Sequence, residues 1–187
     1  MVESIAPEAL ARTALVVVDL QRVFDDPAFG PRNNPACEAN VARLVRAWRA
    51  HGRSVVFVRH HEKDRASVFG PGRARAFKSE LEGEPDLLVT KSVHSAFYGR
   101  PNLHRWLRAR DLDAIVVCGI TTDHCCDTTA RMASDLGYRV YFALDATHTF
   151  DRTSPGGGTL PADLVAERVA ASLDGEFATV VPTERLL

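Results

Sequence analysis

Apolar residues along this chain fall into six short runs, and much of the sequence between them has a helical period. The runs cover residues 14–18, 54–58, 87–90, 114–118, 139–143 and 178–181, and they are rich in β-branched side chains. Continuous apolar runs of this length are typical of strands that are buried on both faces of a parallel sheet. The pattern therefore predicts six strands.

Four of the intervening segments have apolar residues at helical spacing: 36–50, 102–110, 123–136 and 161–173. Residues 1–13 form a short entry segment that includes one helical turn. Residues 62–86 are charged and glycine-rich and show no clear period, so they predict a long loop. This loop is a candidate lid or pocket wall.

Strands that alternate with helices predict an α/β fold: a doubly wound, mostly parallel six-stranded sheet with helices on both faces. The architecture is Rossmann-like, with three layers. The length of 187 residues suits a single domain over 1–187. In such sheets ligands bind at the carboxyl ends of the strands, near the point where the strand order reverses. We expect the functional site in that crevice.

Three chemically reactive side chains follow predicted strands. Asp19 ends the first strand, Lys91 ends the third, and Cys125 lies in the first turn of the helix after the fourth. A helix start favours a thiolate, because its free N–H groups and its dipole stabilise negative charge. The pattern predicts that the three side chains converge, with Cys125 as nucleophile, Asp19 as its base and Lys91 as the stabilising cation.

This combination of groups suits the hydrolysis of a small amide or a related carbon–nitrogen bond. The thiolate attacks the carbonyl, and backbone N–H groups at the helix start hold the oxyanion. Asp19 then protonates the leaving amine and activates the water that hydrolyses the thioester. Asp19 alone has a simpler interpretation as a turn residue, and Cys125 alone as a small buried hydrophobe. Their joint placement at strand ends favours the catalytic interpretation.

Several motifs support a family resemblance. They are DLQRVF at 19–24, KSVHSAF at 91–97 and GITTDHC at 119–125, followed by 129–130, 137–138 and 145–146. In order and spacing they resemble the isochorismatase-like cysteine hydrolases. That family includes nicotinamidases, isochorismatases, and amidohydrolases that act on N-carbamoylsarcosine, maleamate and ureidoacrylate.

The resemblance implies a triad of Asp19, Lys91 and Cys125 and a cis peptide bond between Ile120 and Thr121. It also implies an oxyanion hole formed by the N–H groups of Thr121 and Cys125. Self-association as a dimer or tetramer is a further expectation, because a neighbouring subunit often completes the crevice in this family. The expected substrate contacts are Gln21, Phe24 and Phe97 at motif positions, with His148 and Phe150 in the loop after the fifth strand.

The sequence departs from the metal-containing nicotinamidases, which have an Asp-x-His motif and a further histidine after the first two strands. Here His60 and His61 would place their imidazoles on opposite faces of a strand, a poor geometry for one metal ion. We therefore expect neither metal nor other cofactor, and a substrate other than nicotinamide. Isochorismatases proper lack the cysteine, so Cys125 argues against their reaction.

Two other functions stay open. Asp19 could protonate an enol ether, in which case Cys125 would be dispensable. The crevice could also bind a ligand without chemistry, although no Gly-x-Gly-x-x-Gly motif or phosphate loop follows the first strand.

Composition and charge give no sign of a nucleic-acid or membrane partner, so the small-molecule substrate is the partner that we expect. The chain is 45% apolar and 25% charged with a net charge of −1, which gives no electrostatic reason to expect nucleic acid. It has no apolar run of membrane-spanning length, and its first residues lack the pattern of a signal peptide. We expect a cytoplasmic protein whose four cysteines are reduced.

Overall fold

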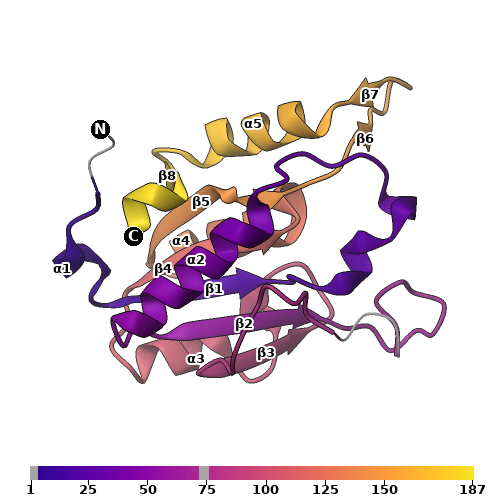
Figure 1. The fold of residues 1–187 in the computed structure, drawn as a ribbon. Helices are drawn as coiled ribbons and strands as arrows, with labels where there is room; N and C mark the ends of the chain where they lie inside the picture. The colour runs from indigo at the N-terminus through magenta and orange to yellow at the C-terminus, as the bar shows by residue number, and fades with distance from the viewer. Residues whose placement is uncertain (1–3, 72–75) are drawn as a thin grey trace.

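Six strands of the computed structural model, which describes residues 4–71 and 76–187, form the central sheet (Figure 1). The strand order is β3-β2-β1-β4-β5-β8, and each neighbouring pair is parallel. The order reverses between β1 and β4, which confirms the doubly wound α/β fold. The strands are β1 (Thr13–Val18), β2 (Val55–His60), β3 (Leu87–Lys91), β4 (Ala114–Ile120), β5 (Arg139–His148) and β8 (Thr179–Val181).

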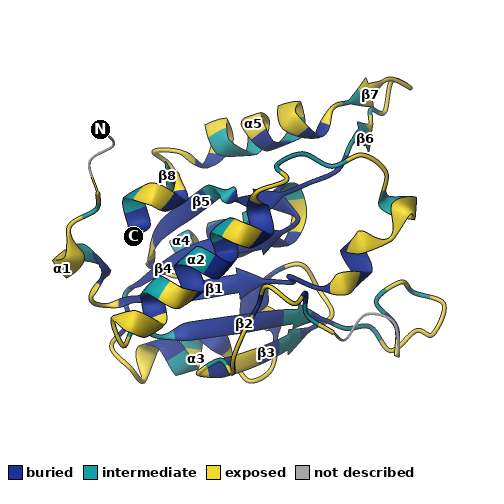
Figure 2. Ribbon diagram, viewed as in Figure 1, coloured by how far each residue is buried: buried dark blue, intermediate teal, exposed yellow. Residues whose placement is uncertain are grey.

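Helices cover both faces of the sheet. α2 (Cys37–Ala50) packs on one face, and α3 (Leu103–Arg108), α4 (Asp127–Asp135) and α5 (Ala162–Leu173) contribute to the core on the other (Figure 1). Side chains of β1 alternate between these two cores: Val17 lies in the cluster of Trp48 from α2, whereas Val16 lies in the cluster of Leu107 from α3. The strands are therefore buried on both sides, as Figure 2 shows.

Short elements occupy the connections. They are α1 (Pro7–Leu10), the 3₁₀ turns η1 (Arg22–Asp25), η2 (Pro27–Phe29), η3 (Ala96–Tyr98) and η5 (Thr183–Leu186), the π turn η4 (Thr122–Cys126) and the antiparallel strands β6 (Arg152–Thr153) and β7 (Thr159–Leu160). Among the described residues, no helix has the length and apolar character needed to cross a bilayer.

β5 is longer than its apolar pattern predicts. It continues beyond residue 143 to His148, past an irregularity in its register with β4, so His148 is the last strand residue rather than part of a loop. The polar Asp145 interrupts the apolar run. Its Oδ1 atom accepts hydrogen bonds from the backbone N–H and the hydroxyl of Thr183, which allows a strand to carry it.

The segment predicted as a long loop folds back over the carboxyl end of the sheet. Phe77 forms an isolated bridge with Gln21, and the N–H of Lys78 donates to the carbonyl of Leu20. Residues 72–75 of this predicted loop lie outside the described residues. The segments after β1, β2 and β5 thus surround the strand ends on the right-hand side of Figure 1.

Candidate active site

Asp19 follows β1 at the point where the strand order reverses. Its φ of 47° lies in the left-handed region, which Asp adopts more readily than most residues. Its N–H donates to the Val58 carbonyl at 2.9 Å, and its own carbonyl accepts from the N–H of Gln21 at 2.7 Å. These bonds turn the chain out of the sheet and leave the Asp19 carboxylate fully buried.

Lys91 ends β3, two strands away from β1, and its long side chain reaches across the end of β2. Its Nζ atom donates to Asp19 Oδ2 at 2.6 Å and to Cys125 Sγ at 3.3 Å. Burial alone would lower the pKa of the Lys91 ammonium, but its interactions with Asp19 first, and with Cys125, raise it above the ordinary value. Lys91 is therefore a cation at neutral pH.

Cys125 lies in η4, directly after β4, and is 7% exposed. The peptide bond between Ile120 and Thr121 at the start of this turn is cis. The Cys125 sulfur and a carboxylate oxygen of Asp19 lie within 4.8 Å of each other. The structure thus brings the three side chains of the predicted triad to one point.

The structure corrects the expectation that the position of Cys125 favours a thiolate. Burial and the adjacent Asp19 carboxylate raise the pKa of the Cys125 thiol to about 12, and Lys91 offsets only part of this effect. The chain around the sulfur also begins as a π turn, with α4 starting two residues later. The free protein therefore holds the thiol, with a carboxylate nearby that can accept its proton.

Two histidines that the sequence analysis did not select border this cluster. His60 Nδ1 lies 3.1 Å from Lys91 Nζ, and His94 Nδ1 lies 3.8 Å from Cys125 Sγ. The strand-end rule could have found His60, because it ends β2 and is the direct register partner of Lys91. His94 follows Lys91 by three residues, a spacing that carries no comparable signal.

Asp19, His60 and Cys125 offer three metal-ligand types whose atoms lie within 4.8 Å of one another. The Lys91 ammonium is hydrogen-bonded to the same three side chains. A divalent cation bound by these atoms would have to displace this buried ammonium or be repelled by it. The cluster therefore fits the lysine cation and does not fit a metal ion beside it.

Gln21 and Thr121 are held near the site by different hydrogen bonds, Gln21 through its side chain and Thr121 through its backbone carbonyl. The Gln21 side chain is fully buried and exchanges two hydrogen bonds with the backbone of His60, at 2.7 and 3.1 Å. The Thr121 carbonyl accepts from the N–H groups of His124 and Cys126, which anchors η4. Gln21 thus supports the end of β2, and its contact with a substrate stays a prediction.

The aromatic residues selected from the sequence separate into two groups. Phe24 and Phe150 belong to a cluster of rings with Phe29 and Phe69, with centroid distances of 5.1 to 6.3 Å. The ring of Phe69 also lies 4.6 Å from that of His60, so this cluster borders the buried charges. Phe97 packs on the opposite side of the sheet, stacked on Tyr138.

His148 lies in the interior rather than in a loop. It is fully buried, its ring meets Phe150 edge-on, and its Nε2 is 3.9 Å from Glu38 Oε1. Burial and the nearby Arg32 lower the pKa of His148 to about 3, so it is neutral. Substrate contact by His148 stays a prediction.

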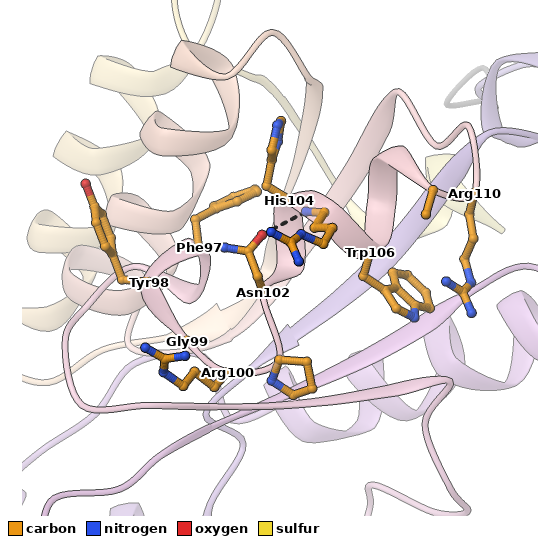
Figure 3. Close-up of a pocket in the computed structure, with 11 residues that line it drawn as sticks. Phe97, Tyr98, Gly99, Arg100, Asn102, His104, Trp106 and Arg110 are labelled. Carbon is orange, nitrogen blue, oxygen red and sulfur yellow. Dashed lines mark hydrogen bonds between the residues drawn. The ribbon is translucent and has the colours of Figure 1, made fainter.

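A groove of about 940 Å³ lies on the outside of η3 and α3 (Figure 3). Phe97 and Tyr98 line one part of it, and the guanidinium of Arg110 lies over the Trp106 ring in another. The buried triad side chains are not among the described residues that line this groove. The groove is therefore separate from the cluster of Asp19, Lys91 and Cys125, where the chemistry is expected.

Comparison with known proteins identifies the chain as a hydrolase of the isochorismatase class. The isochorismatase domain model matches residues 13–156, and the chain belongs to the isochorismatase family. It is 33% identical over 178 residues to the uncharacterized isochorismatase family protein YrdC of Bacillus subtilis, covering 94% of this chain and 95% of that protein.

Two further matches agree with this assignment. The chain is 31% identical to Nicotinamidase 3 of Arabidopsis thaliana over 153 residues, which are 74% of each chain. A crystal structure of an isochorismatase-family hydrolase from Chromobacterium violaceum superposes with a TM-score of 0.88 at 37% identity, covering 92% of this chain and 90% of the other.

Proposed function

We propose that this protein is a cysteine-dependent amidohydrolase that cleaves a carbon–nitrogen bond of a small amide, ureido or carbamoyl compound. The observation that carries the proposal is the position of the Cys125 sulfur, which lies 3.3 Å from the Lys91 ammonium and within 4.8 Å of an Asp19 carboxylate oxygen. A base and a cation thus flank a nucleophile at the switch point of the sheet.

In the first half of the reaction Cys125 is acylated. Its thiol proton moves to Asp19 as the sulfur attacks the substrate carbonyl, and the N–H groups of Thr121 and Cys125 hold the oxyanion. The carbon–nitrogen bond then breaks, and Asp19 returns the proton to the departing amine. Because burial and Asp19 raise the pKa of the thiol in the free protein, the attack requires Asp19 to accept the thiol proton.

In the second half water hydrolyses the thioester. Asp19 accepts a proton from water, whose oxygen bonds to the acyl carbon, and the carbon–sulfur bond breaks. The proton returns to sulfur and regenerates the thiol. The net reaction consumes one water for each amide and yields an acid and an amine, while Lys91 stays charged throughout.

The names of related proteins support this class of reaction. The relatives include one named as a nicotinamidase and one named as the ureidoacrylate amidohydrolase RutB, at 31% and 29% identity. Both names describe the cleavage of amide-type bonds. The loops around the mouth of the sheet would select the particular substrate.

A panel of small amides, ureides and carbamoyl compounds, assayed for ammonia release, tests the proposal. We expect at least one member to be turned over by the native protein and not by Cys125→Ala. Cys125→Ala removes one acceptor of the Lys91 ammonium but keeps its ion pair with Asp19, so thermal unfolding checks that the variant is folded at the assay temperature. Full activity of the folded variant would rule the mechanism out.

A further inference from the structure

The Lys91 ammonium uses all three of its N–H donors inside the protein. They are directed to Asp19 Oδ2 at 2.6 Å, His60 Nδ1 at 3.1 Å and Cys125 Sγ at 3.3 Å. An ammonium group has three donors and no acceptor. His60 therefore supplies the third acceptor of the Lys91 ammonium, although it lies outside the proposed triad.

This contact fixes the protonation state of His60. Because Lys91 can only donate, His60 Nδ1 must be the bare ring nitrogen, and the imidazole is neutral with its proton on Nε2. Nε2 lies 3.1 Å from Glu62 Oε1, a carboxylate oxygen that accepts this proton in a hydrogen bond. The geometry alone thus selects one tautomer.

The His60 ring is held firmly in this orientation. Gln21 binds both the N–H and the carbonyl of the His60 backbone, and the ring of Phe69 lies 4.6 Å away on the side of the aromatic cluster. His60 itself is only 5% exposed. Its Nδ1 atom is therefore a fixed acceptor at the end of β2.

We propose that His60 is a positioning residue of the hydrolase site: its neutral imidazole accepts the third hydrogen bond of Lys91 and so holds the ammonium against Cys125 and Asp19. The inference rests on the proposed function. Without this acceptor one buried N–H of Lys91 has no partner, and the ammonium turns away from the sulfur to satisfy it. The developing thiolate then loses part of its stabilisation.

Burial and the adjacent Lys91 ammonium favour the neutral form of His60. It faces Lys91 from β3, Asp19 from the end of β1, Cys125 from η4 and Glu62 on its own segment. Burial and Lys91 lower the pKa of His60, and they outweigh the opposite effects of Asp19 and Glu62. Acidification protonates Nδ1 and removes the acceptor.

Two matched substitutions separate the two nitrogens of His60. In His60→Asn the side-chain oxygen takes the place of Nδ1, so the acceptor for Lys91 is kept and the contact with Glu62 is lost. In His60→Gln the amide reaches the place of Nε2, so the contact with Glu62 is kept and the acceptor for Lys91 is lost. The rate of alkylation of Cys125 by iodoacetamide, read by peptide mass spectrometry, measures the effect without any substrate.

We expect His60→Asn to be alkylated at about the native rate and His60→Gln about tenfold more slowly, as for a rise of one unit in the thiol pKa. At acidic pH, below the ordinary histidine range because the pKa of His60 is lowered, the native rate should also fall more steeply than that of His60→Asn, which has no imidazole to protonate. Equal rates for the two variants, or a faster His60→Gln, would overturn the inference. Thermal unfolding of both variants checks that each is folded at the assay temperature.

This test is independent of the proposed reaction. A native protein that turns over no amide, with His60→Gln still slower than His60→Asn, would refute the amidohydrolase and keep the role of His60. Turnover that depends on Cys125, with equal alkylation rates of the two His60 variants, would keep the amidohydrolase and refute the role of His60.

Discussion

Lys91 Nζ lies 2.6 Å from Asp19 Oδ2, and neither side chain is exposed to solvent. The two residues are 72 positions apart and meet only because the sheet brings the ends of β1 and β3 to one edge. Burying two charges removes both from water, so such a pair adds little net stability, but removing one partner leaves an unpaired charge in the core.

Breaking this pair should therefore destabilise the protein strongly. We expect Lys91→Met and Asp19→Asn each to lower the free energy of unfolding by about 3–5 kcal/mol. The double variant replaces both charges and should lose clearly less than the sum of the single variants. Urea unfolding at neutral pH measures all four proteins, and additive losses would show that the two charges do not interact.

The role of Cys125 separates the two candidate reactions of this fold. For cleavage of an amide, both Cys125→Ala and Asp19→Asn should reduce turnover by several orders of magnitude. For acid cleavage of an enol ether, Cys125→Ala would stay active and only Asp19→Asn would fail. Steady-state rates of the two variants with the best substrate from each panel distinguish these outcomes.

The raised pKa of Cys125 predicts a simple pH dependence. Below a thiol pKa of about 12 the thiolate fraction increases about tenfold for each pH unit, so alkylation of native Cys125 by iodoacetamide should increase in proportion between pH 7 and pH 9. A plateau that begins near neutral pH would reveal a stable thiolate and contradict the assignment of a resting thiol. Denatured protein serves as the control for an unperturbed cysteine.

Acid stability should depend on Asp123, which links η4 to β6. Although burial raises its pKa, hydrogen bonds from Arg152 and Thr149 outweigh this effect and lower the pKa of Asp123 to about 2. The stabilisation is present above the ordinary Asp pKa and is lost as the pH falls through about 2. The Nε atom of Arg152 lies 2.7 Å from Asp123 Oδ2.

Arg152→Met should thus lower the free energy of unfolding by about 2 kcal/mol at pH 7 and by much less near pH 2. Urea unfolding of the native protein and the variant at both pH values measures the difference. A loss of equal size at the two pH values would mean that the side chain of Arg152 acts by packing alone. Arg168→Met on the exposed face of α5 is a matched control.

Much of the fold and the core of the site follow from the sequence for one physical reason. Apolar runs buried on both faces must form a parallel sheet, and residues directly after such strands gather at one edge. This rule selects Asp19 and Lys91, which directly follow or end strands, and it predicts that Cys125, in the turn after β4, lies beside them. It applies equally to His60 at the end of β2, whose place beside His61 suggests a metal pair before it suggests an acceptor for Lys91.

Other features depend on contacts that no local pattern contains. β5 runs through Asp145 because Thr183, 38 residues later, satisfies its carboxylate. The raised pKa of Cys125 comes from burial and from Asp19, which outweigh the favourable effect expected of a helix start. The burial of Gln21 against the backbone of His60 likewise requires the β1 and β2 ends to be neighbours.

The most direct test of the account is mass spectrometry of the protein quenched during turnover of a substrate found in the amide panel. We predict an acyl group on the peptide that contains Cys125, present during turnover, removed when substrate is exhausted, and absent in Cys125→Ser. Undiminished turnover by Cys125→Ser, with no acyl group on this peptide of the native protein at any time, would contradict the central claim that sulfur forms the covalent intermediate.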